Sequence, residues 1–208
     1  MKFRLSVVFL LMNLLVFAQE KAMTQDEISK LKSSVNTENA KIQTIKTDFI
    51  QYKHMDVLEE DLKSEGQMYF KTRNTLKWSY SKPVSYSIIF KDNKVYINDQ
   101  GKKQTINANQ NKLFEKLSGL IAGSVTGNVF NESEFKIAYV KNNTHYIVKL
   151  SPKTDAVKKY IREVHLFFPF GDAVVSEVKM LEPSGDYTKI LFKNRQLNVK
   201  LEDAVFAQ

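Results

Sequence analysis

The chain has 208 residues, of which 43% are hydrophobic and 26% charged, a balance typical of a globular domain that excludes a disordered or low-complexity chain. It contains no cysteine, which excludes disulfides, thiolate zinc sites, iron–sulfur clusters and cysteine nucleophiles. The formal net charge is +8 and only three histidines are present. We therefore expect no metal site, no cofactor and no enzymatic activity.

The first 18 residues have the pattern of a secretory signal peptide. Lys2 and Arg4 precede an apolar stretch over residues 5–17, and Val16 and Ala18 place small residues at the positions that a signal peptidase recognises. The apolar stretch is shorter than the roughly 20 residues that a membrane-spanning helix needs. We expect cleavage after Ala18 and an exported protein that forms one domain over residues 19–208.

An amphipathic helix is predicted at the start of the exported chain. Thr24 and Glu27 have the spacing of a capping box. Apolar residues then recur at spacings of three, four and seven, with charged residues between them: Ile28, Leu31, Val35, Ile42, Ile45 and Phe49. This pattern predicts a helix that ends near Thr47. A second, shorter helix is predicted over residues 109–123.

From Phe49 onward the hydrophobic period is mostly two, which is typical of strands. Strands are expected near residues 49–54, 64–71, 76–81, 85–91, 94–98, 103–107, 134–140, 145–150, 160–168, 174–182 and 187–193. Turn-forming residues such as Gly101 and Gly171 separate them. Many short strands in this order predict one large antiparallel sheet in meander order, coiled or nearly closed.

The strands carry large apolar and aromatic side chains on alternate positions. Leu76, Trp78 and Tyr80 share one face, whereas Lys77 and Ser79 share the other. Two interpretations of the apolar face remain open. Either helices cover it as an ordinary core, or the sheet curls into a half-barrel whose apolar cavity is only partly filled.

Several motifs resemble the LolA-like outer-membrane lipoprotein carrier family. They are Phe49-x-Gln51, Gly66-x-Met68-Tyr69-Phe70-Lys71, Leu76-Lys77-Trp78-x-Tyr80-x-x-Pro83 and Gly185-Asp186-x-Thr188-x-Ile190-x-Phe192-x-Asn194, with Asn198 and Phe206 beyond them. The resemblance covers roughly residues 40–206. It implies a mainly β fold with helices (α+β), an incomplete and strongly curved antiparallel β-barrel of about eleven strands with a helical lid over an apolar cavity.

The resemblance also implies a function. Such a protein is a periplasmic, non-catalytic carrier that shields the acyl chains of lipoproteins and moves them from the inner to the outer membrane. Its partners would be acylated lipoproteins, an inner-membrane lipoprotein-releasing transporter, and an outer-membrane acceptor or the membrane surface. It would be a monomer that binds no nucleic acid. The alternative from the same group of curled sheets is a periplasmic sensor or regulator that binds lipids or lipoproteins.

Site residues follow from placing this fold on the chain. The cavity would be lined by Phe49, Met68, Phe70, Leu76, Trp78, Tyr80, Tyr86, Ile88, Phe90, Tyr146 and Val148. The lid would combine the first helix with the apolar residues of the second: Leu113, Phe114, Leu117, Leu120 and Ile121.

One departure from the family pattern concerns the closed lid. Proteobacterial members of the family carry an Arg directly after the Lys of the second strand, and this Arg is thought to latch the closed lid. Here Thr72 stands at that position and Arg73 follows one residue later, so Arg73 is the candidate lid latch. The proline that usually follows is Asn74.

Overall fold

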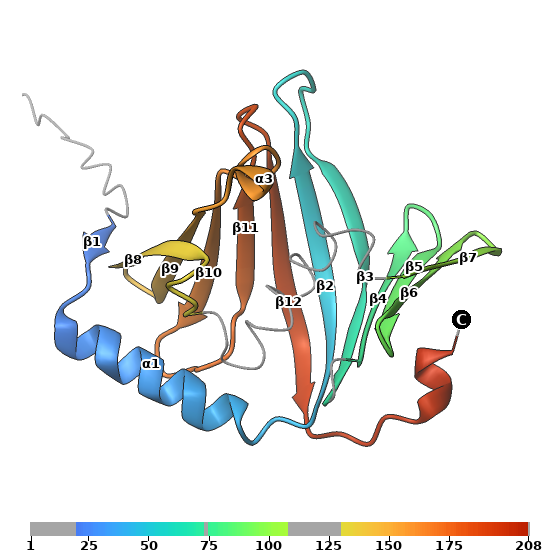
Figure 1. Ribbon diagram of the computed structural model, residues 1–208, viewed down its shortest axis with the longest axis horizontal. Coiled ribbons are helices and arrows are strands. Elements are labelled where there is room, and N and C mark those ends of the chain that lie inside the picture. Colours follow the sequence, from blue (N-terminus) through green and yellow to red (C-terminus); the bar gives the residue numbers. More distant parts are fainter. Residues whose placement is uncertain (1–19, 73–74, 108–129, 208) are drawn as a thin grey trace, which may run out of the picture.

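The computed structural model describes residues 20–72, 75–107 and 130–207, and one antiparallel sheet dominates them (Figure 1). Its twelve described strands lie in the order β1, β8, β9, β10, β11, β12, β2, β3, β4, β5, β6, β7. The first six strands in chain order are β1 (Lys21–Ala22), β2 (Thr44–His54), β3 (Leu62–Lys71), β4 (Thr75–Lys82), β5 (Tyr86–Lys91) and β6 (Lys94–Asp99). The remaining six are β7 (Lys102–Asn107), β8 (Phe135–Lys141), β9 (His145–Pro152), β10 (Glu163–Pro169), β11 (Glu177–Leu181) and β12 (Tyr187–Leu197).

Each of the eleven predicted strands has a counterpart, but their arrangement is not one meander. Two meanders, β2–β7 and β8–β12, are joined because β12 pairs with β2. Strand β1, which pairs with β8, was not predicted. Strand β10 begins three residues later than expected, because the short helix α3 (Asp155–Lys158) and a turn come before it. The sheet is open, with β1 and β7 at its two ends.

The predicted first helix is shorter than expected. Helix α1 (Gln25–Asn39) begins at the predicted capping box, in which Thr24 Oγ1 accepts a hydrogen bond from the backbone N–H of Glu27. It ends at Asn39, and residues assigned to its last turns form β2 instead. Ile45 and Phe49 fit a helical spacing, but with Thr47 they also alternate along a strand. The β-branched residues in this stretch favour the strand.

The sheet curls toward one side, which we call the inner face and which carries Phe49 and Trp78. Trp78 on β4 and Phe192 on β12 are separated by two intervening strands, a span of about 14 Å in a flat sheet. Their ring centroids are only 6.1 Å apart. Side chains from distant strands meet in this way only when the sheet bends toward them.

Two buried clusters divide the inner face between them. The helix cluster lies under α1 and consists of Met23, Leu31, Val35, Phe135, Val148, Leu150, Val157, Ile161, Val164, Leu166, Phe168, Ala173, Val175 and Val178. The aromatic cluster lies over β2, β3 and β4 and consists of Ile42, Ile45, Phe49, Met68, Phe70, Leu76, Trp78 and Val174. The loop between β10 and β11 joins them, because Ala173 and Val175 belong to one cluster and Val174 to the other.

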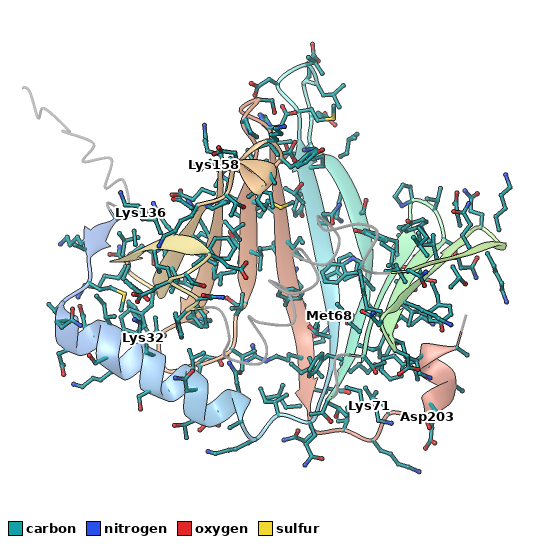
Figure 2. All side chains as sticks on the ribbon, viewed as in Figure 1. Lys32, Met68, Lys71, Lys136, Lys158 and Asp203 are labelled. Atoms are coloured by element: carbon teal, nitrogen blue, oxygen red, sulfur yellow. The ribbon has the colours of Figure 1, made fainter. Side chains whose placement is uncertain are left out.

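The C-terminal residues 198–206, here called the C-terminal strap, run from the end of β12 along the lower edge of the sheet toward β4 (Figure 1). We call the side of the sheet opposite the inner face the outer face. They end in the 3-10 helix η2 (Asp203–Phe206). Lys71 and Asp203 form an ion pair of 2.7 Å at the lower edge of the sheet, where Figure 2 labels them both. Lys77 Nζ donates to the carbonyl of Val205, and Phe206 is buried. The strap therefore covers part of the side opposite Trp78.

Candidate functional site

The aromatic cluster is built around Phe49. Its ring stacks on Trp78 with a centroid distance of 4.3 Å and meets the edge of Tyr80 at 5.2 Å. Tyr80 donates its hydroxyl to Gln51 Oε1 at 3.0 Å, and burial raises the pKa of this hydroxyl. Three aromatic rings from β2 and β4 thus form one continuous apolar surface with a single polar edge.

Gly66 on β3 makes this arrangement possible. It lies between Phe49 and Tyr80 in the sheet register, at an irregularity in the β3–β4 pairing. A Cβ atom at this position would lie 2.6 Å from the Phe49 ring and 2.0 Å from the carbonyl oxygen of Ser79. The Phe49 ring therefore occupies the space that any side chain at position 66 would need.

Most of the predicted cavity residues lie on this surface. Met68 pairs with Trp78, and Phe70 with Leu76, and all four are at most 5% exposed. Strand β5 adds three more side chains to the same face. Tyr86 pairs with Tyr80, Ile88 with Trp78 and Phe90 with Leu76. The sequence alternation thus placed these side chains on one face of one curled sheet.

Tyr146 and Val148 lie apart from that surface. Both are on the inner face of β9, where Val148 is fully buried in the helix cluster and Tyr146 packs against it. The predicted residues therefore fall into two groups, one over β2–β5 and one beneath α1.

The predicted signal peptide, the second helix and the latch lie outside the described residues. This applies to residues 1–18, to Arg73 and to the lid residues Leu113, Phe114, Leu117, Leu120 and Ile121. Of the two helices predicted to form a lid, the structure describes α1, which contributes Leu31 and Val35 to the helix cluster.

Some residues of the inner face were not predicted. Ile42 and Ile45 were assigned to the helix, and Val174 was assigned to a strand, although it lies in a loop. Phe192 packs against both clusters, and its alternation with Ile190 along β12 could have revealed it. Asn39 is a buried polar residue at the end of α1, and nothing in its sequence context marks it.

The outer face is polar beside the aromatic cluster. Asp48 accepts hydrogen bonds from Gln67 and Asn194, both at 2.8 Å, and these bonds hold the pKa of its carboxyl below the usual range. A hollow of about 390 Å³ lies at this position, and a larger one of about 750 Å³ lies between the C-terminal strap and the start of β2. The larger hollow is lined by ion-paired side chains such as Lys71 and Asp203. Most of the residues that line the two hollows are polar or charged, unlike those of the aromatic cluster.

The described residues contain no group of three or more His, Asp or Glu side chains placed to hold a metal ion. Within the same residues, no helix is long and apolar enough to cross a membrane.

An open, curled antiparallel sheet with an apolar aromatic inner face is the fold class that these observations define. The family described as outer membrane lipoprotein carrier protein LolA matches residues 40–208. The chain belongs to this family.

The chain is similar to several solved structures at low sequence identity. The complex of Pseudomonas aeruginosa MucA and MucB is similar, with a TM-score of 0.50 and 9% identity over 88% of this chain and 60% of that chain. A LolA superfamily protein from Nitrosomonas europaea has a TM-score of 0.47 and 11% identity over 90% of this chain and 99% of that chain. The lipoprotein LppX of Mycobacterium tuberculosis has a TM-score of 0.47 and 7% identity, over 84% and 98% of the two chains. No curated protein sequence matches this chain.

Proposed function

We propose that this protein is a periplasmic carrier of lipoproteins, which holds their acyl chains against the aromatic cluster and transfers them from the inner to the outer membrane. The observation that carries the proposal is the continuous apolar surface over β2, β3, β4 and β5. Membership of the family supports it. The proposed carrier acts by binding alone, without catalysis.

The size of the hydrophobic effect explains why such a surface is needed. Each methylene group of an acyl chain that is exposed to water costs about 0.8 kcal/mol, so one long chain costs on the order of 10 kcal/mol. Aromatic rings such as Phe49, Trp78 and Tyr80 cover a large area with few rotatable bonds. They are well suited to shield acyl chains and still release them.

Helix α1 is the proposed lid in this mechanism. Leu31 and Val35 hold it on the inner face, and the ion pair between Lys32 and Glu132 ties it to the segment before β8. Each buried aliphatic side chain contributes about 1.5–3 kcal/mol. An acyl chain that replaces these contacts offsets their loss, so loading can displace the helix.

Cargo analysis tests this function. The protein is purified from the periplasm of a producing bacterium, and bound acylated proteins are identified by mass spectrometry. We expect acylated lipoproteins with the wild type. We expect far fewer with Ile88→Glu, because Ile88 pairs with Trp78 on the inner face and a carboxylate there is unfavourable beside acyl chains. Ser87→Glu, on the outer face of the same strand, is the matched control. Equal cargo on wild type and Ile88→Glu would contradict the proposed surface.

A sensor that binds lipids or lipoproteins is the second candidate. The similarity to the MucA/MucB complex favours it, because that structure shows this fold bound to a protein partner. The two candidates differ in the step after binding. A carrier passes its cargo to vesicles of outer-membrane phospholipid, whereas a sensor retains it and changes its affinity for a protein. A vesicle transfer assay with the loaded protein distinguishes them.

A further inference from the structure

Asn39, the last residue of α1, is a buried amide without a hydrogen-bond partner. The residue is 4% exposed, and neither Nδ2 nor Oδ1 is hydrogen-bonded to any residue in the described part of the chain. The nearest buried apolar residues on either side of it in the chain are Val35 and Ile42. Val35, one turn earlier, belongs to the helix cluster, and Ile42 belongs to the aromatic cluster. In the sequence, Asn39 therefore lies between Val35, the last residue of α1 in the helix cluster, and Ile42, the first residue of the aromatic cluster.

Asn198, which lies near the end of α1, has a partner for each end of its amide. Asn198 accepts from the backbone N–H of Gln43 at 2.7 Å and donates to the carbonyl of Lys41 at 3.2 Å. The indole N–H of Trp78 makes no hydrogen bond of normal geometry, but the hydroxyl of Tyr80 lies beside it. Asn39 differs from these groups because both ends of its amide remain unpaired.

An unpaired buried amide is unfavourable, and an apolar residue of similar size would stabilise the closed protein. Asn36, about one turn before Asn39 in α1, is exposed, so the same helix also carries an asparagine that faces water. A buried amide without a partner calls for an explanation, and a partner that arrives with a bound ligand would supply one.

We propose that Asn39 binds the carbonyl linkage that joins an acyl chain to its cargo, an inference that rests on the proposed carrier function. The acyl chains of a lipoprotein are attached through ester and amide groups. Nδ2 of Asn39 can donate to such a carbonyl, and Oδ1 can accept from an amide N–H. The aromatic cluster binds hydrocarbon without fixing its position along the surface. A hydrogen bond at Asn39 would fix the polar end of the chain at the end of α1, with the hydrocarbon extending over Phe49 and Trp78.

A pair of probes that differ in one carbonyl group tests this role. Monopalmitoylglycerol carries an ester, and hexadecylglycerol carries an ether at the same position. Binding to the protein without residues 1–18 is followed by the fluorescence of Trp78, the single tryptophan of the chain. The wild type should bind the ester more tightly. Asn39→Leu should weaken ester binding about fivefold to tenfold, as expected for one lost hydrogen bond, and leave ether binding unchanged.

Stability provides a second measurement. Because Asn39→Leu removes an unpaired amide, its melting temperature in the absence of probe should rise by about 2–4 °C. Asn36→Leu, on the exposed side of the same helix, is the matched control and should change neither affinity. Should Asn39→Leu fail to fold, Asn39→Ala takes its place in the binding assay.

The outcomes separate this inference from the function on which it rests. A loss confined to the ester supports a role for Asn39 in binding the linkage. Equal losses for ester and ether, or no loss for either, overturn it and leave the carrier function intact. A wild type that binds neither probe overturns the carrier function itself.

Discussion

At the scale of single residues, the contact between Gly66 and Phe49 gives a steric reason for a glycine in the middle of a strand. Glycine weakens a strand unless another group needs the space. Here the Phe49 ring takes that space and reaches Trp78 on β4. The motif that begins at Gly66 is thus connected with the one that contains Trp78, although the two lie on different strands.

Replacement of Gly66 by alanine should destabilise the protein. The new Cβ would clash with the Phe49 ring and with the backbone of Ser79, and a backbone atom cannot rotate away. Overpacking of this kind costs about 1–3 kcal/mol. Thermal unfolding followed by circular dichroism should show a melting temperature several degrees lower. Ser64→Ala on the same strand serves as control, and an unchanged melting temperature for Gly66→Ala would show that the sheet can open at this position.

A further prediction for a single residue concerns Glu27 and the pH dependence of stability. Hydrogen bonds from Lys141 and from the backbone of Thr24 hold the pKa of Glu27 below its ordinary value of 4.5. A carboxyl whose pKa is lowered on folding stabilises the protein above the unfolded-state pKa. This contribution is lost as the pH falls through the folded-state pKa.

The melting temperatures of wild type and Glu27→Gln test this contribution. At pH 7 the wild type should be the more stable protein, and the difference should shrink below pH 4.5. A difference that stays constant from neutral to acid pH would show that the ionised carboxylate contributes nothing.

At the scale of elements, the sequence predicted strands better than their boundaries with helices. Strict alternation, as in β4 and β5, identified both the strands and their apolar faces. The end of α1 was wrong because Ile42, Ile45 and Phe49 satisfy a helical and a strand period at once. Only pairing with β12 and β3 decides between them, and that pairing is tertiary.

The role of α1 as a lid can be tested with a crosslink. Lys32 on α1 and Glu132 form an ion pair of 3.1 Å, so cysteines at both positions can be joined by a short bismaleimide. The chain has no native cysteine that would interfere. The crosslinked protein should remain folded and lose binding of monopalmitoylglycerol, because α1 can no longer leave the inner face.

A second crosslink provides the control for the lid experiment. Lys71 and Asp203 form an ion pair of similar length between β3 and the C-terminal strap, away from α1. Joining cysteines at these positions should leave probe binding unchanged. Equal binding by the protein crosslinked at α1 would mean that this helix is a fixed part of the core.

At the scale of the whole molecule, the pairing of β12 with β2 is the feature of the fold that the sequence did not predict. Each hairpin follows from local alternation and turn residues, but this pairing joins residues 44–54 to residues 187–197 and has no local signal. It brings the two meanders into one curled sheet. The residues of the candidate site, likewise, were predicted only in part. The aromatic cluster followed from periodicity, whereas the place of Val148 beneath α1 and the burial of Asn39 depend on where the helix packs.

The C-terminal strap supports the open sheet from the side opposite the proposed binding surface. Phe206 is 5% exposed, and Ile89 on the outer face of β5 is 1% exposed. Lys77, which pairs with Ile89 across the strands, donates to the strap at Val205, and partial burial lowers the pKa of Lys77. The strap thus shields apolar side chains that the curl of the sheet leaves on its outside.

Phe206→Ala should therefore separate stability from binding. Loss of a buried phenylalanine costs about 3 kcal/mol, which urea unfolding monitored by circular dichroism can measure. The affinity for monopalmitoylglycerol, measured well below the unfolding transition, should stay at the wild-type value because Phe206 and Trp78 lie on opposite faces of the sheet. Ile88→Glu should show the reverse pattern, with weakened binding at a smaller loss of stability. If Phe206→Ala weakened binding as much as Ile88→Glu, the two faces would be coupled and the strap would help to shape the binding surface.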